Sequence, residues 1–223
     1  MRLGSSSLSF AAAAILATST LAAHADTIFT LVSAFDAASS GLTTITFDGI
    51  APAGGFVDEG TSFSIGGASF SSTNYINLNG AAYYPDTYPG SGLPTYNSGG
   101  YLLPTIDATT ELTISFAPST AVSIDTGGLF GPASVPITLS DGFTTTLTAP
   151  DSITGTGALD FIGFTSSTPI TSITIDWPGY PNFGALDNVS YGTAVTPEPS
   201  TFVFLGTGLL GLAGVARRKF LTV

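Results

Sequence analysis

Apolar and polar residues alternate along much of the central part of this 223-residue chain. In four segments the apolar side chains fall on every second position: Ile45 and Phe47; Leu112, Ile114 and Phe116; Val135, Ile137 and Leu139; and Ile173, Ile175 and Trp177. A period of two places alternate side chains on opposite faces of an extended strand, so that one face is buried and the other is solvated. These segments therefore predict half-buried β-strands.

Short turn-forming pairs separate several of these strands. Gly66-Gly67 lies between TSFSI and ASFSS, and Asp141-Gly142 lies between VPITLS and FTTTL. Gly-Gly and Asp-Gly favour two-residue type I′ turns, because both central positions of such a turn need a positive φ. We therefore predict two β-hairpins at these positions.

The order of the elements predicts an all-β fold. Many short strands are separated by Gly, Pro, Asn and Asp, and residues 34–40 form either one helical turn or an irregular lead-in. The segment DNVSYG supplies a short last strand, and no internal repeat points to a solenoid or a propeller. We predict an antiparallel two-sheet, jelly-roll-like β-sandwich.

The first 25 residues have the pattern of an export signal. Arg2 precedes an apolar, alanine-rich run over residues 8–23, and the AHA of residues 23–25 matches the small-x-small pattern that signal peptidase cuts. Cleavage there makes Asp26 the first residue of the mature chain. The alternative is a buried helix of the folded domain.

The C-terminal segment combines an apolar stretch with almost all of the positive charge. Residues 202–216 are apolar and glycine-rich, and Arg217, Arg218 and Lys219 follow directly. The stretch is shorter than the roughly 20 residues of a usual spanning helix, but extension to Ser200 and snorkelling of the arginines offset part of the difference. We predict a transmembrane helix whose basic end is cytoplasmic, with the domain outside. The alternative is a C-terminal core helix.

The same tail resembles a known sorting signal. Pro197-Glu198-Pro199, the apolar segment and the basic cluster, over residues 197–223, are similar to the PEP-CTERM signal of exosortase substrates in Gram-negative bacteria. This resemblance implies export, transient anchoring in the inner membrane, and processing near the PEP motif by an exosortase-type membrane enzyme. The central segments TFDG, SDG, FIGFTSSTPITSITI and LDNVSYG also resemble the sandwich domains that precede such signals.

Composition narrows the chemistry of the intervening domain, residues 26–196. This stretch has no Lys, Arg, His, Cys or Met and holds 14 of the 15 acidic residues. Nucleic-acid binding is excluded, because it needs cations that neutralise phosphate. A histidine base, a cysteine nucleophile and a Schiff-base lysine are excluded as well. We therefore predict a protein that is not an enzyme.

The carboxylates leave one enzymatic alternative, a glycoside hydrolase. Such an enzyme needs two carboxylates at a defined separation across a cleft, which spacing in sequence does not reveal. The candidates are Asp58, Glu59, Asp86, Asp107 and Glu111. This is the least favoured function.

Two positions near the ends of the domain predict a metal site. Asp48 ends an early strand and Asp187-Asn188 opens the final one, so these residues meet if the terminal strands lie side by side. Carboxylate and amide oxygens are the ligands that calcium prefers, and we predict structural Ca²⁺ at Asp48, Asp187 and Asn188. The alternative is that these residues are turn formers bonded to their own backbone.

Residues 72–104 differ from the rest of the domain. They hold six of the eight tyrosines, interleaved with Gly, Pro and Asn, and they lack a strand period. Tyrosine rings stack on sugar faces while their hydroxyls bond to sugar hydroxyls. We predict a ligand site at Tyr83, Tyr84, Tyr88 and Tyr96. The alternative is a loop whose rings pack over one sheet.

These observations predict an exported cell-surface or extracellular-matrix protein, associated with biofilm or exopolysaccharide. Its partners are signal peptidase and an exosortase-type processing enzyme, with a polysaccharide as a further partner. A carbohydrate-binding module that uses the Tyr-rich loop 72–104 is the alternative function.

Overall fold

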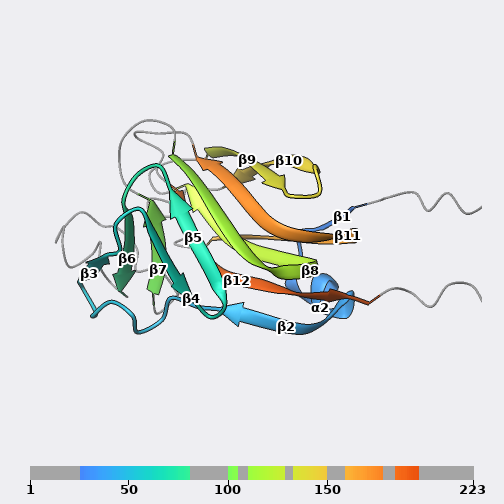
Figure 1. Cartoon of the computed structure of the whole chain (residues 1–223), viewed down its shortest axis with the longest axis horizontal. Helices are drawn as coiled ribbons and strands as arrows, with labels where there is room; N and C mark the ends of the chain where they lie inside the picture. Colours follow the sequence, from blue (N-terminus) through green and yellow to red (C-terminus); the bar gives the residue numbers. More distant parts are fainter. Residues whose placement is uncertain are drawn as a thin grey trace, which may run out of the picture.

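The computed structural model describes the domain as antiparallel β-structure with one short helix (Figure 1). The described residues are 26–80, 100–104, 110–128, 133–149, 159–177 and 184–195. The strands are β1 (Thr27–Phe29), β2 (Ser39–Ile45), β3 (Phe56–Asp58), β4 (Ser62–Ile65), β5 (Ala68–Ser72), β6 (Ile76–Gly80), β7 (Gly100–Pro104), β8 (Thr110–Gly128), β9 (Ala133–Leu139), β10 (Thr144–Ala149), β11 (Asp160–Trp177) and β12 (Gly184–Ala194). The helix is α2 (Val32–Ala37).

Two long strands, β8 and β11, organise the sheet. They pair antiparallel from Trp177 opposite Thr110 to Asp160 opposite Thr126. Beyond them, one half of the sheet continues through β5 and β4 on one side and β9 and β10 on the other. The other half continues through β12 to β2, and through β7 to β6 and β3, while β1 pairs with β11.

The length of these two strands corrects the prediction of uniformly short ones. β8 has 19 residues and β11 has 18, and each contains a proline, Pro118 in β8 and Pro169 in β11. The β8–β11 register shifts between Thr165 and Ser172. Because proline lacks a backbone N–H, it interrupts the hydrogen-bond ladder locally, but here each strand resumes beyond it. β12 is likewise longer than expected, with 11 residues.

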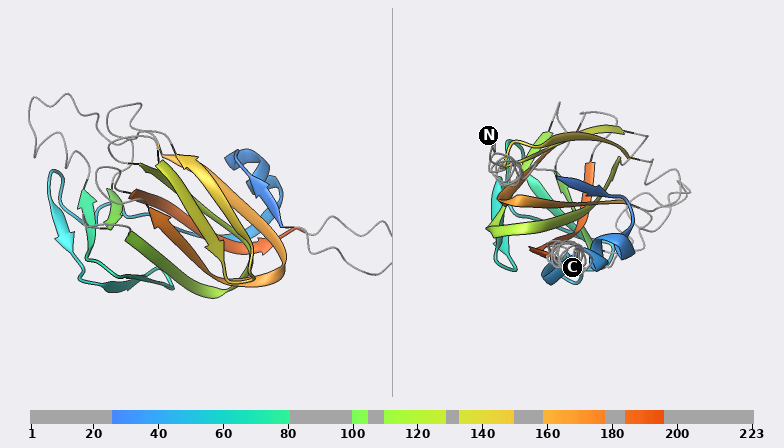
Figure 2. Two further views of the ribbon diagram at one scale, coloured as in Figure 1. Left: turned by 90° about the horizontal axis from the view of Figure 1, so that it is seen from above. Right: turned by 90° about the vertical axis from the view of Figure 1, so that its right-hand side faces the viewer.

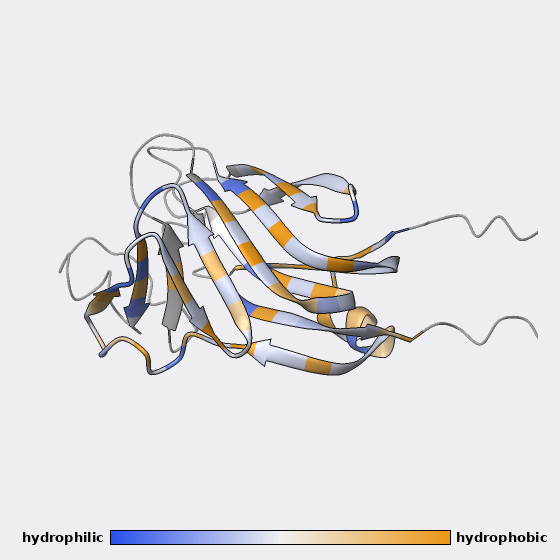
Figure 3. Ribbon diagram, viewed as in Figure 1, coloured by the Kyte–Doolittle hydropathy of each residue, from blue (hydrophilic) through white to orange (hydrophobic). Residues whose placement is uncertain are grey.

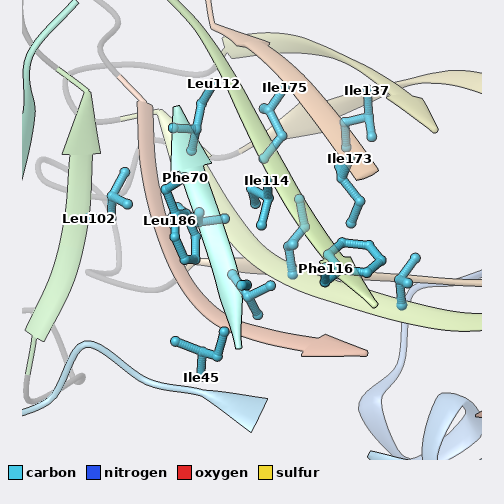
Figure 4. Close-up of a cluster of buried hydrophobic side chains, with 14 of the residues drawn as sticks. Ile45, Phe70, Leu102, Leu112, Ile114, Phe116, Ile137, Ile173, Ile175 and Leu186 are labelled. Carbon is cyan, nitrogen blue, oxygen red and sulfur yellow. The ribbon is translucent and has the colours of Figure 1, made fainter. Parts of the chain in front are cut away.

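The sheet curls around one hydrophobic core, which gives a sandwich-like arrangement (Figure 2). The same face of β8 is buried along its length: Leu112, Ile114, Phe116, Val122 and Ile124. Side chains from both halves of the sheet meet in this core (Figure 4). Burial of each large apolar side chain favours folding by about 1.5–3 kcal/mol.

The hydropathy pattern matches the expected faces. Alternating hydrophobic and hydrophilic bands run along the strands (Figure 3). The residues predicted to be buried are at most 8% exposed: Ile45, Phe47, Leu112, Ile114, Phe116, Val135, Ile137, Leu139, Ile173, Ile175 and Trp177. Every described strand and every described residue of this core lie between residues 27 and 194.

Both predicted hairpins are present. Gly66 and Gly67, with φ of 59° and 83°, join β4 to β5 as a two-residue turn. The β9–β10 turn is not type I′, which corrects the prediction, because Gly142 has φ of 96° but Asp141 is not among the positive-φ residues. The turn covers the residues between Leu139 and Thr144, and within it the Asp141 Oδ1 accepts a 3.0 Å hydrogen bond from the Phe143 backbone N–H.

Helix α2 covers the outer face of one half of the sheet, beside β11 and β2 (Figure 1). Its buried residue Phe35 has its ring centroid 5.7 Å from that of Phe161 on β11. The ring fits because residue 163 is glycine, where a Cβ would lie 2.6 Å from Phe35 Cδ2. Of the two possibilities predicted for residues 34–40, the helical turn is present, and it begins two residues earlier.

Among the described residues, no helix has the length and apolar character needed to cross a membrane. The predicted signal peptide 1–25 and the predicted transmembrane segment 202–216 lie outside the described residues.

Candidate functional site

β2 and β12 lie side by side, as expected, and the C-terminal end of β2 forms an acidic corner with the middle of β12 and with β8. β12 begins at Gly184, three residues before Asp187, and not at Asp187 as predicted. Val189 pairs with Ile45, and Asp187 pairs with Asp125 of β8. The register of β12 on β8 shifts between Asp187 and Ser190, so β12 carries a bulge there. Bulges bend a strand and redirect its side chains, and they are over-represented next to functional sites.

Asn188 lies in this bulge in a left-handed conformation. Its φ is +47°, and it is the non-glycine residue with positive φ in the described part of the chain. Asparagine enters this region more readily than most residues because its short amide bonds locally. Here Asn188 N–H donates to Asp187 Oδ1 over 2.8 Å, and Nδ2 donates to Asp125 Oδ2 over 2.8 Å.

The surroundings of the carboxyl groups at this corner disfavour their ionised form. Burial raises the pKa of Asp187 from 3.8 to about 6, the nearby charges of Asp48 and Asp125 add to the rise, and backbone N–H groups oppose it. Burial also raises the pKa of Asp125, against the hydrogen bond from Asn188. Since residues 26–196 contain no cationic side chain, a proton or a bound cation would relieve this repulsion.

The structure brings the three predicted metal residues to one corner and adds a fourth. Asp125 was missed, although an aspartate inside the buried strand segment VSIDTG is a detectable signal. The described residues contain no group of three or more His, Cys, Asp or Glu side chains arranged to hold a metal ion. A cation here would therefore depend on amide or backbone oxygens as well. The Asp187 carboxylate also bonds its own following backbone N–H, as the turn-former alternative expected.

A cavity of about 370 Å³ lies beside this corner, between α2 and the outer face of the sheet. Its walls combine two aromatic rings with polar groups: Phe35, Phe161, Thr44, Ser123, Asp125 and Ser190. The Thr44 and Ser190 hydroxyls are 2.8 Å apart and join β2 to β12. Apolar walls with a few convergent polar groups are typical of small-molecule sites of this size.

The other predicted site residues are placed differently. Tyr83, Tyr84, Tyr88 and Tyr96 lie outside the described residues, as do Asp86 and Asp107. Asp58, by contrast, is exposed, and its Oδ1 accepts a 2.8 Å hydrogen bond from the Gly60 N–H in a turn. Glu59 is half-buried and Glu111 is exposed, each close to the end of a strand.

The residues of the sorting motif, Pro197, Glu198 and Pro199 with Arg217, Arg218 and Lys219, also lie outside the described residues. Comparison with protein families identifies a PEP-CTERM protein-sorting motif at residues 195–219. This confirms the resemblance seen in the sequence. The chain carries a PEP-CTERM sorting motif and is an exported, sorted protein.

Comparisons over the rest of the chain do not identify a family. No curated protein matches the sequence. Among solved structures, the chain is similar to the Family 11 Carbohydrate-Binding Module from Clostridium thermocellum in complex with β-1,3-1,4-mixed-linked tetrasaccharide. The identity is 11%, the TM-score is 0.31, and the match covers 63% of this chain and 96% of that module.

Proposed function

We propose that the protein acts at the cell surface or in the extracellular matrix, in a biofilm or exopolysaccharide layer. The observation that carries this proposal is the sorting motif at residues 195–219, which begins where β12 ends at Ala194. In the sequence, the signal thus follows the folded domain directly. Signal peptidase removes residues 1–25, and an exosortase-type enzyme processes the tail while residues 202–216 anchor the chain in the inner membrane.

The proposed role is binding rather than catalysis. Asp125 and Asp187 have raised pKa values, but a general acid or base also needs a reactive partner in reach. The contacts of these two groups are instead with the side-chain amide and backbone N–H of Asn188 and with the backbone of Phe47. Such contacts hold the carboxyl groups in place and give no nucleophile.

Localisation tests the function. We compare the full chain with a chain that lacks residues 197–223, both expressed in a bacterium that has an exosortase-type enzyme. The full chain is expected at the outer surface or in the matrix, and the shortened chain in the periplasm. If both chains accumulate in the same fraction, sorting through the tail does not determine where the domain acts.

A second candidate function, saccharide binding, is favoured by the cavity beside α2. The Phe161 ring offers a surface for a sugar face, and the Asp125 carboxylate with the Ser123 and Thr44 hydroxyls offers hydrogen-bond partners. The cavity provides an alternative to the Tyr-rich loop 72–104, which remains part of the same proposal. The jelly-roll-like order of strand connections predicted from the sequence is also part of this proposal.

Glycan-array binding of residues 26–196 tests the saccharide proposal. Thr44→Val removes a cavity hydroxyl, and Thr43→Val is the matched control, because Thr43 does not line the cavity. Selective binding that is weakened about tenfold by Thr44→Val alone supports the cavity. Binding lost only in Tyr83→Ala and Tyr84→Ala assigns the sugar to the loop, and no binding to any glycan contradicts both.

Calcium at the acidic corner is a further part of the proposal. Asp48, Asp187 and Asn188 offer carboxylate and amide oxygens of the kind that calcium binds. The repulsion that Asp48 and Asp125 exert on Asp187 supports the idea, because a divalent cation would offset it.

A further inference from the structure

A second, smaller cavity lies where the start of β1 meets β11 and the β9–β10 turn. It measures about 260 Å³, and its lining residues are Asp26, Asp141, Ser166 and Thr168. Thr27 pairs with Thr165, which places Asp26 next to the bend of β11 (Figure 1). Asp141 comes from the turn between β9 and β10. Three separate parts of the chain therefore meet around this small polar space.

One carboxylate oxygen of Asp141 lacks a hydrogen-bond partner among the described residues. Its Oδ1 accepts the hydrogen bond from the Phe143 N–H that shapes the turn. Its Oδ2 has less than 1 Å² of exposed surface and no hydrogen-bond partner within the described residues. An oxygen that is shielded from water and unbonded is costly, particularly in a charged group. A cationic group is the partner that this position calls for.

The mature domain contains no side chain that could supply such a cation. Residues 26–196 include no Lys, Arg or His. Cleavage after Ala25, however, converts the backbone amide of Asp26 into an α-ammonium group. The first cation of the domain is thus created on a residue that already lines the cavity.

We propose that the α-ammonium group of Asp26 occupies this cavity in the mature protein and forms an ion pair with Asp141 Oδ2. The precursor lacks this pair, because its residue 26 nitrogen is an uncharged amide. Removal of the signal peptide therefore adds an ion pair between the residue before β1 and the β9–β10 turn, and this pair stabilises the exported form. The inference rests on cleavage after Ala25 but not on any ligand or on the final location.

The absence of lysine makes a selective test possible. The domain 26–196, released with a free Asp26 amine, carries one primary amine, so acetic anhydride neutralises that group alone once hydroxylamine has removed esters. Mass spectrometry verifies the addition of one acetyl group. Acetylation is expected to lower Tm by about 2–4 °C, the shift that a modest ion pair produces in a domain of this size.

Variants assign the effect to the proposed pair. In Asp141→Asn the side-chain carbonyl still accepts from the Phe143 N–H, so the turn is kept, and acetylation is expected to leave Tm unchanged. Asp58→Asn is the matched control, since Asp58 also bonds a turn N–H, and β3, which ends at Asp58, lies at the opposite end of the domain from β1 (Figure 1). In that variant acetylation should lower Tm as in the original chain.

A chain that begins at Ala25 gives an independent measurement if Asp141→Asn does not fold. Its ammonium group lies one residue, roughly 3.5 Å, farther along the chain, so its Tm should match that of the acetylated form. The proposal is overturned if acetylation does not change Tm, or if its effect persists in Asp141→Asn. It is also overturned if Ca²⁺ or Mg²⁺ raises the Tm of the acetylated chain through Asp141, because the cavity is then a metal site.

Discussion

The side-chain amide of Asn188 donates a 2.8 Å hydrogen bond to Asp125 Oδ2, and this contact joins the bulge of β12 to β8. The bond explains two features together. It supports the left-handed backbone of Asn188, and it gives a partner to a carboxylate whose pKa is raised by burial.

Replacement of Asn188 separates these two contributions. Asn188→Ala removes the bond to Asp125 and places an ordinary Cβ in the left-handed region, so the free energy of unfolding should fall by about 2–4 kcal/mol. Asn188→Gly loses the bond but tolerates the backbone, and its loss should be about 1–2 kcal/mol smaller. Urea denaturation measures both variants. Equal losses would mean that backbone strain plays no part.

The raised pKa of Asp187 predicts that the domain is more stable in mild acid. The folded state holds a proton up to pH of about 6, whereas the unfolded chain releases it near 3.8. The folded state therefore binds more protons in this window, and the free energy of unfolding falls as pH rises from about 4 to 6. The fall due to this group is at most about 3 kcal/mol.

Urea denaturation at pH 4.5 and pH 7 in calcium-free buffer checks this. Asp187→Asn keeps an acceptor for the Asn188 N–H but cannot ionise, so it should remove much of the pH dependence and be no less stable than the original at pH 7. Asp58→Asn, at an exposed turn, serves as the control. An unchanged pH dependence in Asp187→Asn would show that the buried carboxyl group is not its source.

Calcium should raise the Tm of residues 26–196 at pH 7. A cation that binds only the folded state stabilises it by RT ln(1 + [L]/Kd), about 2.7 kcal/mol at a hundredfold excess, or roughly 5–10 °C. Asp187→Ala should abolish the shift and Asp48→Ala should reduce it. The shift should also weaken at pH 5, where Asp187 holds a proton.

Two salts distinguish a site from general screening. Magnesium should replace calcium poorly because it demands stricter octahedral geometry. If sodium chloride at high ionic strength gives the same rise in Tm, the cause is screening of the acidic domain as a whole. A melting curve that EDTA leaves unchanged would make Asp48, Asp187 and Asn188 structural residues only.

Any side chain at residue 184 is predicted to destabilise the domain, because Gly184 packs against the indole ring of Trp177. A Cβ at residue 184 would overlap that ring, whose Nε1 donates a 3.1 Å hydrogen bond to Thr126 Oγ1. Gly184→Ala should lower the free energy of unfolding by about 1–3 kcal/mol and shift the emission of this single tryptophan to longer wavelength. Thr146→Ala, on the exposed face of β10, is the control. Unchanged emission and stability would contradict this packing.

The sequence allowed the core of the fold to be predicted because alternation is a local signal. Residues such as Leu112, Ile114 and Trp177 are buried as their period of two indicated. The lengths of β8 and β11 were not predictable in the same way. Pro118 and Pro169 look like chain breaks locally, and the neighbouring strands that hold both sides together are distant in sequence.

The candidate site was predictable only in part for a similar reason. Asp48, Asp187 and Asn188 were expected together because terminal strands often pair. The part played by Asp125 depends on its register opposite Asp187, which is a long-range property of the sheet. The cavity beside α2 depends on the docking of Phe35 on Phe161, which no local pattern reveals.

Processing of the tail is the most direct consequence of the sorting motif. Glu198→Ala should stall processing while the domain stays folded, since residue 198 lies beyond the last described strand, which ends at Ala194. Replacement of Arg217, Arg218 and Lys219 by neutral residues should instead disturb membrane orientation. If the two changes gave the same phenotype, separate roles for the motif and the basic cluster would not be supported.

The central claim is that the protein is exported and then released from its tail, and intact-mass spectrometry of the mature protein from its producing cells tests it most directly. The account predicts a chain that begins at Asp26 and ends near Pro197-Glu198-Pro199. A mature protein that retains Arg217, Arg218 and Lys219 would contradict it.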